Sequence, residues 1–126
     1  MRIMTWNVHR AHKGSLLWQY VSQVQPDLLL LQEVGSIPND ILQDFDHLLR
    51  PATTRLGKPQ KFHTGVLVKG TITGENALSS DCAWVNRELQ FFHGNLISCT
   101  VELHDGTKFE VMSVHSPAWP VDNSRS

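Results

Sequence analysis

Three polar residues lie at or just beyond the ends of strand-like stretches of the sequence, and their side chains are of kinds that contact metals and phosphates. Asn7 lies near the end of the stretch 2–8, Glu33 follows the apolar run 28–32, and His115 follows the stretch 107–114. A buried carboxylate needs a cation, a metal or several hydrogen-bond donors beside it, because burying an isolated charge costs several kcal/mol. Each residue also has a structural interpretation: a solvated strand end for Glu33, a turn cap for Asn7 and a core histidine for His115.

Asn7 and Glu33 belong to two predicted strands that a predicted helix connects. Segment 2–8 is rich in β-branched and aromatic residues, which favours a strand, and we expect this strand at the centre of a sheet. The run 28–32 lacks the alternation of a half-solvated strand and therefore predicts a strand buried on both faces. A strand, a helix and a second strand in succession imply parallel strands. Asn7 and Glu33 are then expected at the same edge of the sheet.

The connecting helix is predicted from apolar residues that recur at helical spacing. They are Leu17, Tyr20, Val21 and Val24, with Leu16 and Trp18 beside them. Ser15 is expected to cap the first turn, and Pro26 to end the helix. His9 and His12 precede it and are expected to be solvated, because two histidines three residues apart, without a helical frame or a third ligand, do not make a metal site.

The remainder of the chain predicts short elements and a hairpin. In chain order these are a helix at 39–45, a return to the sheet at 47–50, an exposed loop at 51–60, a strand at 63–69, an unassigned stretch at 70–81, and strands at 87–92, 95–103 and 107–114. The last two are joined by a tight turn at 104–106, for which Asp-Gly is the turn signal. His115 comes directly after the final strand of this series.

Composition indicates one soluble domain. The 126 residues include 11 Lys and Arg against 12 Asp and Glu, so no overall charge attracts nucleic acid or an anionic membrane. No run approaches the roughly 18 apolar residues that a membrane span needs, and the first ten residues lack an apolar signal core, so we expect a cytoplasmic protein. Cys82 and Cys99 lie in apolar or strand-like settings without metal-ligand spacing, and both are expected to be free buried thiols.

Taken together, these motifs resemble the N-terminal half of the endonuclease/exonuclease/phosphatase superfamily, whose members share the deoxyribonuclease I-like fold. The resemblance rests on MTWNV around Asn7, PDLLLLQEV through Glu33, TGVLVK after the loop, and FEVMSVHSP around His115. It spans residues 1–120 as a partial domain and leaves 121–126 as a polar tail. The fold that it implies is α/β, the N-terminal half of a two-sheet α/β sandwich, with a mixed sheet and flanking helices.

The activity implied by this resemblance is hydrolysis of phosphodiester or phosphomonoester bonds with Mg²⁺, or Mn²⁺ in its place. Glu33 matches the metal-binding glutamate of the family, and Asn7 matches the asparagine that supports the metal and the scissile phosphate. His115 resembles the histidine that donates a hydrogen bond to the phosphoryl group as charge develops on it. Arg87 and His63 are candidates for contact with the substrate, although Arg87 lacks a sharp motif around it and a surface role fits it better.

Two parts of the family pattern are missing. An Asp-x-Asn pair orients the attacking water in the family, but here Asp122 and Asn123 are adjacent and lie in the polar tail. The C-terminal Asp-His pair is also missing. We therefore expect this chain alone to be inactive, and to require either a missing C-terminal half or self-association. The alternative is a non-catalytic fragment that acts as an interaction module through an exposed sheet face.

The substrate is the least determined expectation. The near-neutral charge argues against a dedicated binder of duplex DNA, which would carry a basic surface. The loop with Arg55, Lys58 and Lys61 still offers local contacts to phosphates, so nucleic acid stays among the expected phosphoester substrates.

Overall fold

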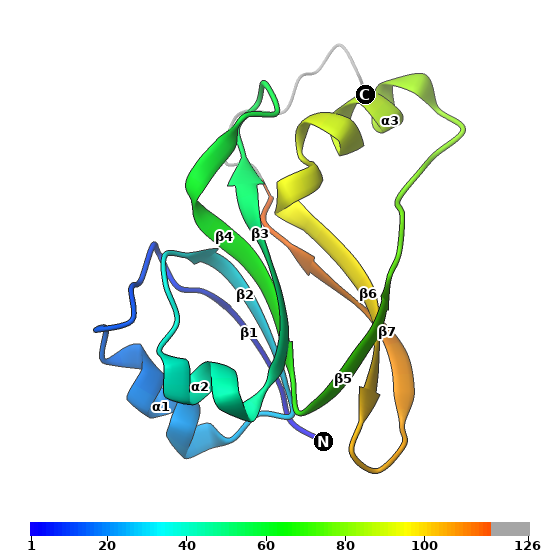
Figure 1. Cartoon of the computed structure of the whole chain (residues 1–126). Helices are drawn as coiled ribbons and strands as arrows, with labels where there is room; N and C mark the ends of the chain where they lie inside the picture. The colour runs from blue at the N-terminus through cyan, green and yellow to red at the C-terminus, as the bar shows by residue number, and fades with distance from the viewer. Residues whose placement is uncertain (117–126) are drawn as a thin grey trace.

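Two β-sheets packed face to face carry the fold in the computed structural model, which describes residues 1–116 (Figure 1). The larger sheet has the strand order β1-β2-β4-β3: β1 (Ile3–Asn7), β2 (Leu28–Val34), β4 (Pro59–Val68) and β3 (Asp46–Thr53). The smaller sheet has the order β5-β6-β7: β5 (Gly70–Glu75), β6 (Leu96–Leu103) and β7 (Lys108–Val114). These coarse features agree with the predicted α/β class with two sheets.

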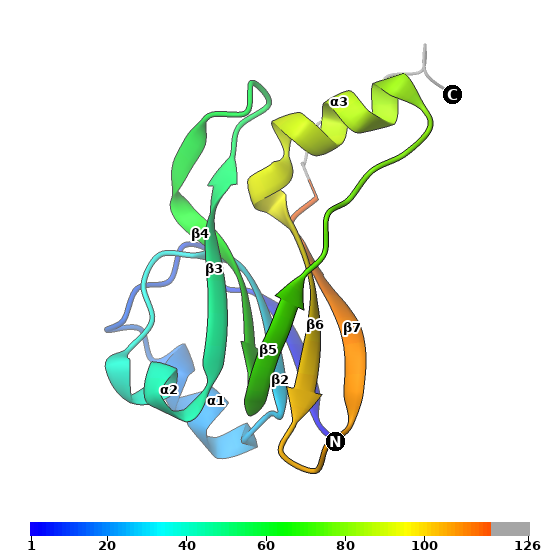
Figure 2. The ribbon, with the colours of Figure 1, turned by 45° about the vertical axis from the view of Figure 1, so that its right-hand side comes forward.

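Helices cover one face of the larger sheet and one end of the sandwich (Figures 1 and 2). Helices α1 (Leu17–Val24) and α2 (Asn39–Asp44) pack on the outer face of the larger sheet. Helix α3 (Ala83–Phe91) and the 3₁₀ turn η1 (His93–Asn95) directly precede β6 and lie at one end of the sandwich (Figure 1). The predicted helices near 15–25 and 39–45 are thereby confirmed.

The core has two layers, one on each face of the larger sheet. The outer layer joins the sheet to the helices through residues including Trp18, Val21, Leu29, Leu31, Ile41, Phe45 and Leu67. The inner layer joins the two sheets through Leu28, Val66, Val68, Ile97, Cys99 and Val101. Strand β2 contributes to both layers, which confirms that it is buried on both faces.

The first two strands are parallel, as predicted, and their register aligns Asn7 with Gln32. Asn7 and Glu33 therefore do reach the same edge of the sheet. The expected central position of β1 is wrong, because among the described residues β1 pairs only with β2 and is the outermost strand (Figure 1). The reason is topological: β4 returns antiparallel on the far side of β2, so the chain never adds a described strand beyond β1.

Two predicted segments are wrong. Residues 87–92 are not a strand, because Val85, Leu89 and Phe92 repeat at helical spacing and lie along one side of α3. The predicted loop at 51–60 is reduced to residues 54–58, since Ala52 and Thr53 are buried in β3 and β4 begins at Pro59.

Ser15 does not cap α1. Its Oγ accepts a hydrogen bond from the His12 amide (3.1 Å) and so closes the preceding turn, while Leu16 occupies the cap position without a side-chain bond. Within the helix, Trp18 and Val21 are the buried residues, whereas Leu16 and Tyr20 are exposed. The apolar stripe of α1 is thus narrower than predicted.

The interaction-module alternative requires an exposed sheet face, but the inner face of the larger sheet is largely covered in the described part of the chain. Strands β5–β7 form a second sheet that covers the inner face of β2, β4 and β3. Both cysteines are free, as predicted, and Cys99 is buried in the inner layer, but the predicted burial of Cys82 is wrong, because Cys82 is exposed just before α3. The described part of the chain contains no helix long and apolar enough to cross a membrane. The predicted boundary at residue 120 and the polar tail lie outside the described residues.

Candidate functional site

The ends of β1 and β2 are held together by backbone hydrogen bonds that continue beyond the strands. The Val8 amide donates to the Gln32 carbonyl (3.0 Å), and the Arg10 amide donates to the Glu33 carbonyl (2.6 Å). The side-chain Oδ1 of Asn7 accepts a bond from the His9 amide (3.0 Å), which fixes the first turn after β1. Asn7 therefore does cap a turn, and it is itself the β1 residue that aligns with Gln32 of β2.

Glu33 lies at an irregularity of β2. Its φ is +53°, an uncommon value for a residue with a side chain, and the pairing of β2 with β4 shifts register between Leu31 and Val34. The Glu33 side chain is only 17% exposed, and its Oε1 lies 3.8 Å from Nε of Arg10. Arg10 itself has φ +63°, so both partners of this ion pair depend on unusual backbone conformations. Glu33 is therefore not a fully solvated strand end.

His115 lies near this pair, across the gap between the two sheets. Its ring meets the ring of buried Phe62 edge to face, with 6.1 Å between the centroids. The Arg10 guanidinium lies over the same Phe62 ring, 4.9 Å from its centroid. Glu33, Arg10, Phe62 and His115 thus form a continuous row at one end of the sandwich, from the larger sheet to the smaller one.

The Nδ1 atom of the His115 imidazole is buried and has no hydrogen-bond partner within residues 1–116. The backbone of His115 is fixed, because its amide donates to the carbonyl of Asn95 (2.7 Å). Asn95 is itself held, since its Oδ1 accepts a bond from the Thr53 amide (2.7 Å). A buried nitrogen on a fixed ring is a candidate to contact a ligand.

Buried hydrogen bonds between the sheets fix the strands that carry Glu33 and His115. Gln32 Nε2 donates to Ser113 Oγ (3.1 Å), and Ser113 Oγ donates to the Leu31 carbonyl (3.2 Å). Gln32 directly precedes Glu33, and Ser113 lies two residues before His115. These cross-sheet hydrogen bonds therefore set the distance between the two candidate residues.

The two remaining predicted residues occupy different surroundings. His63 aligns with Val34 in the β2–β4 ladder, and its Nδ1 lies 3.3 Å from the Val34 carbonyl, so it borders the same end of the sandwich. Arg87 is exposed on α3 rather than on a strand. The substrate-contacting role proposed for each of them stays a prediction. His9 and His12 are exposed, as expected for solvated histidines.

Two hollows border this end of the molecule. The first, about 340 Å³, is mostly apolar and lies between α3 and the ends of β6 and β7, with Trp84, Leu89, Val114 and His115 among its lining residues. His115 therefore lies between this groove and Phe62.

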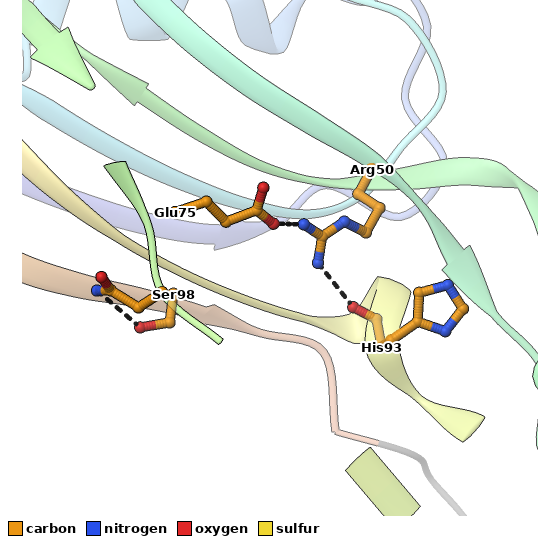
Figure 3. Close-up of polar contacts among 5 residues, drawn as sticks. Arg50, Glu75, His93 and Ser98 are labelled. Atoms are coloured by element: carbon orange, nitrogen blue, oxygen red, sulfur yellow. Dashed lines mark hydrogen bonds and ion pairs between the residues drawn. The ribbon is translucent and has the colours of Figure 1, made fainter. Parts of the chain in front are cut away.

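The second hollow, about 680 Å³, lies under α3 on the β5 side. Arg50 spans it: its guanidinium pairs with Glu75 and donates to the His93 carbonyl (3.1 Å), as Figure 3 shows. Nearby, Asn76 Nδ2 donates to Ser98 Oγ (3.4 Å). Because these polar groups are paired with one another, we interpret this hollow as a structural junction between β3, β5 and η1.

Sequence reasoning missed Arg10 and Phe62 as members of the site. Arg10 lies just beyond the predicted strand 2–8, and its position depends on the left-handed backbone at His9 and Arg10. Phe62 falls between the predicted loop at 51–60 and the predicted strand at 63–69, whereas in the structure it begins the buried part of β4. Neither position carries a motif; alternation along β4 would have been the only available signal for Phe62.

Asn7 and Glu33 offer side-chain oxygens that can ligate a metal ion at this end of the sandwich. Among residues 1–116, no three His, Cys, Asp or Glu side chains gather into a ready metal cluster. One carboxylate and one amide oxygen at adjacent strand ends do fit the preference of Mg²⁺, which takes one or two carboxylates and keeps several waters. The residues present are thus compatible with a hydrated Mg²⁺ and with a substrate that completes its coordination.

Comparisons with family models, with curated proteins and with solved structures found no match to this chain. The superfamily resemblance consequently rests on the motifs alone.

Proposed function

We propose that this end of the sandwich is the metal- and phosphate-binding part of a Mg²⁺-dependent phosphoesterase site. The observation that carries the proposal is the row Glu33, Arg10, Phe62 and His115, which brings together a carboxylate, a guanidinium and an imidazole nitrogen that has no partner among residues 1–116. A negatively charged, tetrahedral phosphoester is the ligand class that such a set of groups suits best.

Each residue has a defined part in this proposal. Glu33 and Asn7 would hold the metal ion, which supplies a Lewis acid for a phosphoryl oxygen when bound. Arg10, whose side chain is 68% exposed, can leave Glu33 and pair with a phosphate oxygen through its fork of donors. His115 donates a hydrogen bond to the phosphoryl group as negative charge accumulates there. The described residues include no carboxylate placed to activate water, so we expect turnover by this chain alone to be below detection.

The first test measures Mn²⁺ binding. The readout is the electron paramagnetic resonance signal of free Mn²⁺, which falls as the ion binds. We expect one site in the wild-type chain, lost in Glu33→Gln and retained in Glu102→Gln. Glu102 is a matched control, because it is a surface strand carboxylate whose ion-pair partner Lys108 lies 3.9 Å away. Equal binding by Glu33→Gln and wild type, or no binding by the wild type at millimolar Mn²⁺, would overturn the proposal.

A second arm uses hydrolysis of plasmid DNA and of bis(p-nitrophenyl) phosphate. Any metal-dependent cleavage must disappear in Glu33→Gln and persist in Glu102→Gln. Cleavage that survives the Glu33 substitution would place the chemistry elsewhere.

Nucleic acid is the substrate class that the local charge favours. Segments 8–16 and 54–63 lie at the same end of the sandwich and contain Arg10, Lys13, Arg55, Lys58 and Lys61 but no acidic residue. Replacing Arg55, Lys58 and Lys61 by Ala should reduce the salt dependence of binding to a duplex, lowering the slope by about one for each lost phosphate contact. An unchanged slope would argue for a small phosphoester instead.

A further inference from the structure

Arg10 combines a fixed backbone with a side chain that lies between two partners. Its Nε is 3.8 Å from Oε1 of Glu33, and its guanidinium is 4.9 Å from the centroid of the Phe62 ring. The Arg10 amide donates to the Glu33 carbonyl (2.6 Å). The next residue, Ala11, accepts a bond from the Gly35 amide (2.7 Å), so the backbone is held to the end of β2 on both sides. The side chain, which is 68% exposed, is the part of Arg10 that can change partners.

The ion pair between Arg10 and Glu33 is incomplete. A separation of 3.8 Å is too long for a hydrogen bond, and neither side chain makes a hydrogen bond to any other group of residues 1–116. The guanidinium carries five N–H donors, and the Glu33 carboxylate is only 17% exposed. A divalent cation in direct contact attracts such a carboxylate more strongly than a monovalent one 3.8 Å away. Glu33 can therefore exchange Arg10 for a metal ion.

Phe62 can keep the guanidinium at the site after this exchange. The Phe62 side chain is buried, and its ring also meets the imidazole of His115 edge to face, with 6.1 Å between the centroids. Contact of a guanidinium with the face of an aromatic ring leaves its N–H donors available to a second partner. An Arg10 side chain that has left Glu33 but still lies over Phe62 can thus donate to a phosphate oxygen beside His115.

We propose that Arg10 is a switch between Glu33 and the phosphoester, and that Phe62 is the positioning residue that supports it in both states. Without a metal ion, Arg10 neutralises Glu33. When Glu33 binds the ion, the Arg10 guanidinium pairs with the phosphate instead. The metal ion and the phosphoester are then coupled through Arg10, and each raises the affinity for the other by the same factor. This inference rests on the proposed function and adds a coupling between its two ligands.

The first test measures Mn²⁺ affinity from the electron paramagnetic resonance signal of the free ion. Arg10→Gln removes the cation that competes for Glu33 and should bind Mn²⁺ at least threefold more tightly than the wild type. Lys13→Gln is the matched control, because it removes the same charge from the same segment, 8–16. Lys13 is exposed and forms no ion pair within residues 1–116, so its substitution should change the affinity less than twofold.

The second test measures the Kd of dimethyl phosphate by nuclear magnetic resonance titration, with and without saturating Mg²⁺. With Mg²⁺, Arg10→Gln should weaken binding at least fivefold, and Lys13→Gln less than twofold. The factor by which Mg²⁺ strengthens binding should also be at least threefold smaller in Arg10→Gln than in the wild type. Tighter metal binding together with weaker phosphate binding separates a switch from a purely structural ion pair, because a disrupted site loses both ligands.

Phe62→Leu tests the support. Leucine keeps a buried apolar side chain but has no ring, so dimethyl phosphate should bind at least threefold more weakly while the Mn²⁺ affinity changes less than twofold. Phe62→Tyr keeps the ring and should stay within twofold of the wild type for both ligands. The ring-proton signals of His115 provide a direct readout, because they should shift when the neighbouring ring is lost and stay in place in Phe62→Tyr.

Two results would overturn the switch while the proposed function stands: Mn²⁺ binding by Arg10→Gln that is equal to or weaker than that of the wild type, or dimethyl phosphate binding that this substitution leaves unchanged. Equal losses of phosphate affinity in Phe62→Tyr and Phe62→Leu would contradict the positioning role of Phe62. A wild-type chain without a Glu33-dependent Mn²⁺ site would overturn both the proposed function and the switch.

Discussion

Substituting Ser113 by Ala should weaken the contact between the two sheets at the point where it positions the candidate site. The Ser113 hydroxyl accepts from Gln32 (3.1 Å) and donates to the Leu31 carbonyl (3.2 Å), and the residue is fully buried. Alanine removes both bonds and adds no group that replaces them. Gln32 would keep only its longer bond to Thr5 (3.4 Å).

The expected loss follows from these contacts. Each hydrogen bond contributes about 1 kcal/mol net, and a buried amide left with a poor partner costs up to about 1 kcal/mol more, so we expect a loss of about 2–3 kcal/mol in the free energy of unfolding. With a urea dependence of about 2 kcal/mol per molar, the midpoint should fall by about 1 M.

Equilibrium urea unfolding by fluorescence measures this change. Ser98→Ala is the control, because Ser98 is also buried but only accepts a 3.4 Å bond from Asn76 at the opposite side of the smaller sheet, and should lose less than about 1 kcal/mol. The double variant Gln32→Met, Ser113→Ala removes both partners and should cost little more than Ser113→Ala alone. A loss below about 0.5 kcal/mol in Ser113→Ala, or strict additivity in the double variant, would refute the cross-sheet hydrogen bonds as a coupled unit.

Three further predictions concern other parts of the fold. Arg50→Gln breaks the ion pair with Glu75, which is partly solvated, so urea unfolding should show a loss of about 1 kcal/mol that shrinks in 1 M NaCl. Gly94→Ala should cost about 3 kcal/mol in the same assay, because the added Cβ would lie 1.9 Å from the Pro51 carbonyl oxygen; a loss below about 1 kcal/mol would contradict this packing. A thiol reagent should modify exposed Cys82 rapidly and buried Cys99 only on unfolding. Burial raises the pKa of the Cys99 thiol, so its contribution to stability is full below its ordinary pKa and is lost as pH rises through the raised value; melting temperatures that do not fall at high pH would count against this.

The sequence predicted best where a signal is local. The parallel pair β1 and β2 follows from a strand, a helix and a strand of suitable length, and this succession predicts that Asn7 and Glu33 lie at the same edge of the sheet. The β6–β7 hairpin follows from Asp105 and Gly106, where φ of +88° suits glycine and the Asp105 side chain accepts from the Thr107 amide (2.9 Å).

Prediction failed where long-range pairing decides the outcome. Nothing in segment 2–8 tells a central strand from an edge strand, because that depends on where later strands add. Helix α3 was missed because Arg87 to Phe92 also reads as a short strand, although Val85, Leu89 and Phe92 recur at helical spacing and line one groove beside the ends of β6 and β7. The place of Arg10 depends on a left-handed backbone, which no residue-type preference at that position predicts.

The most direct test of the account is a nuclear magnetic resonance titration of the wild-type chain with dimethyl phosphate in saturating Mg²⁺. If Glu33 and His115 belong to one phosphate-binding site, the amides of Asn7, Glu33 and His115 should shift together with one dissociation constant, and Glu33→Gln should abolish all three shifts. Shifts confined to Glu33, with His115 unaffected at saturation, would contradict a site shared between the two sheets.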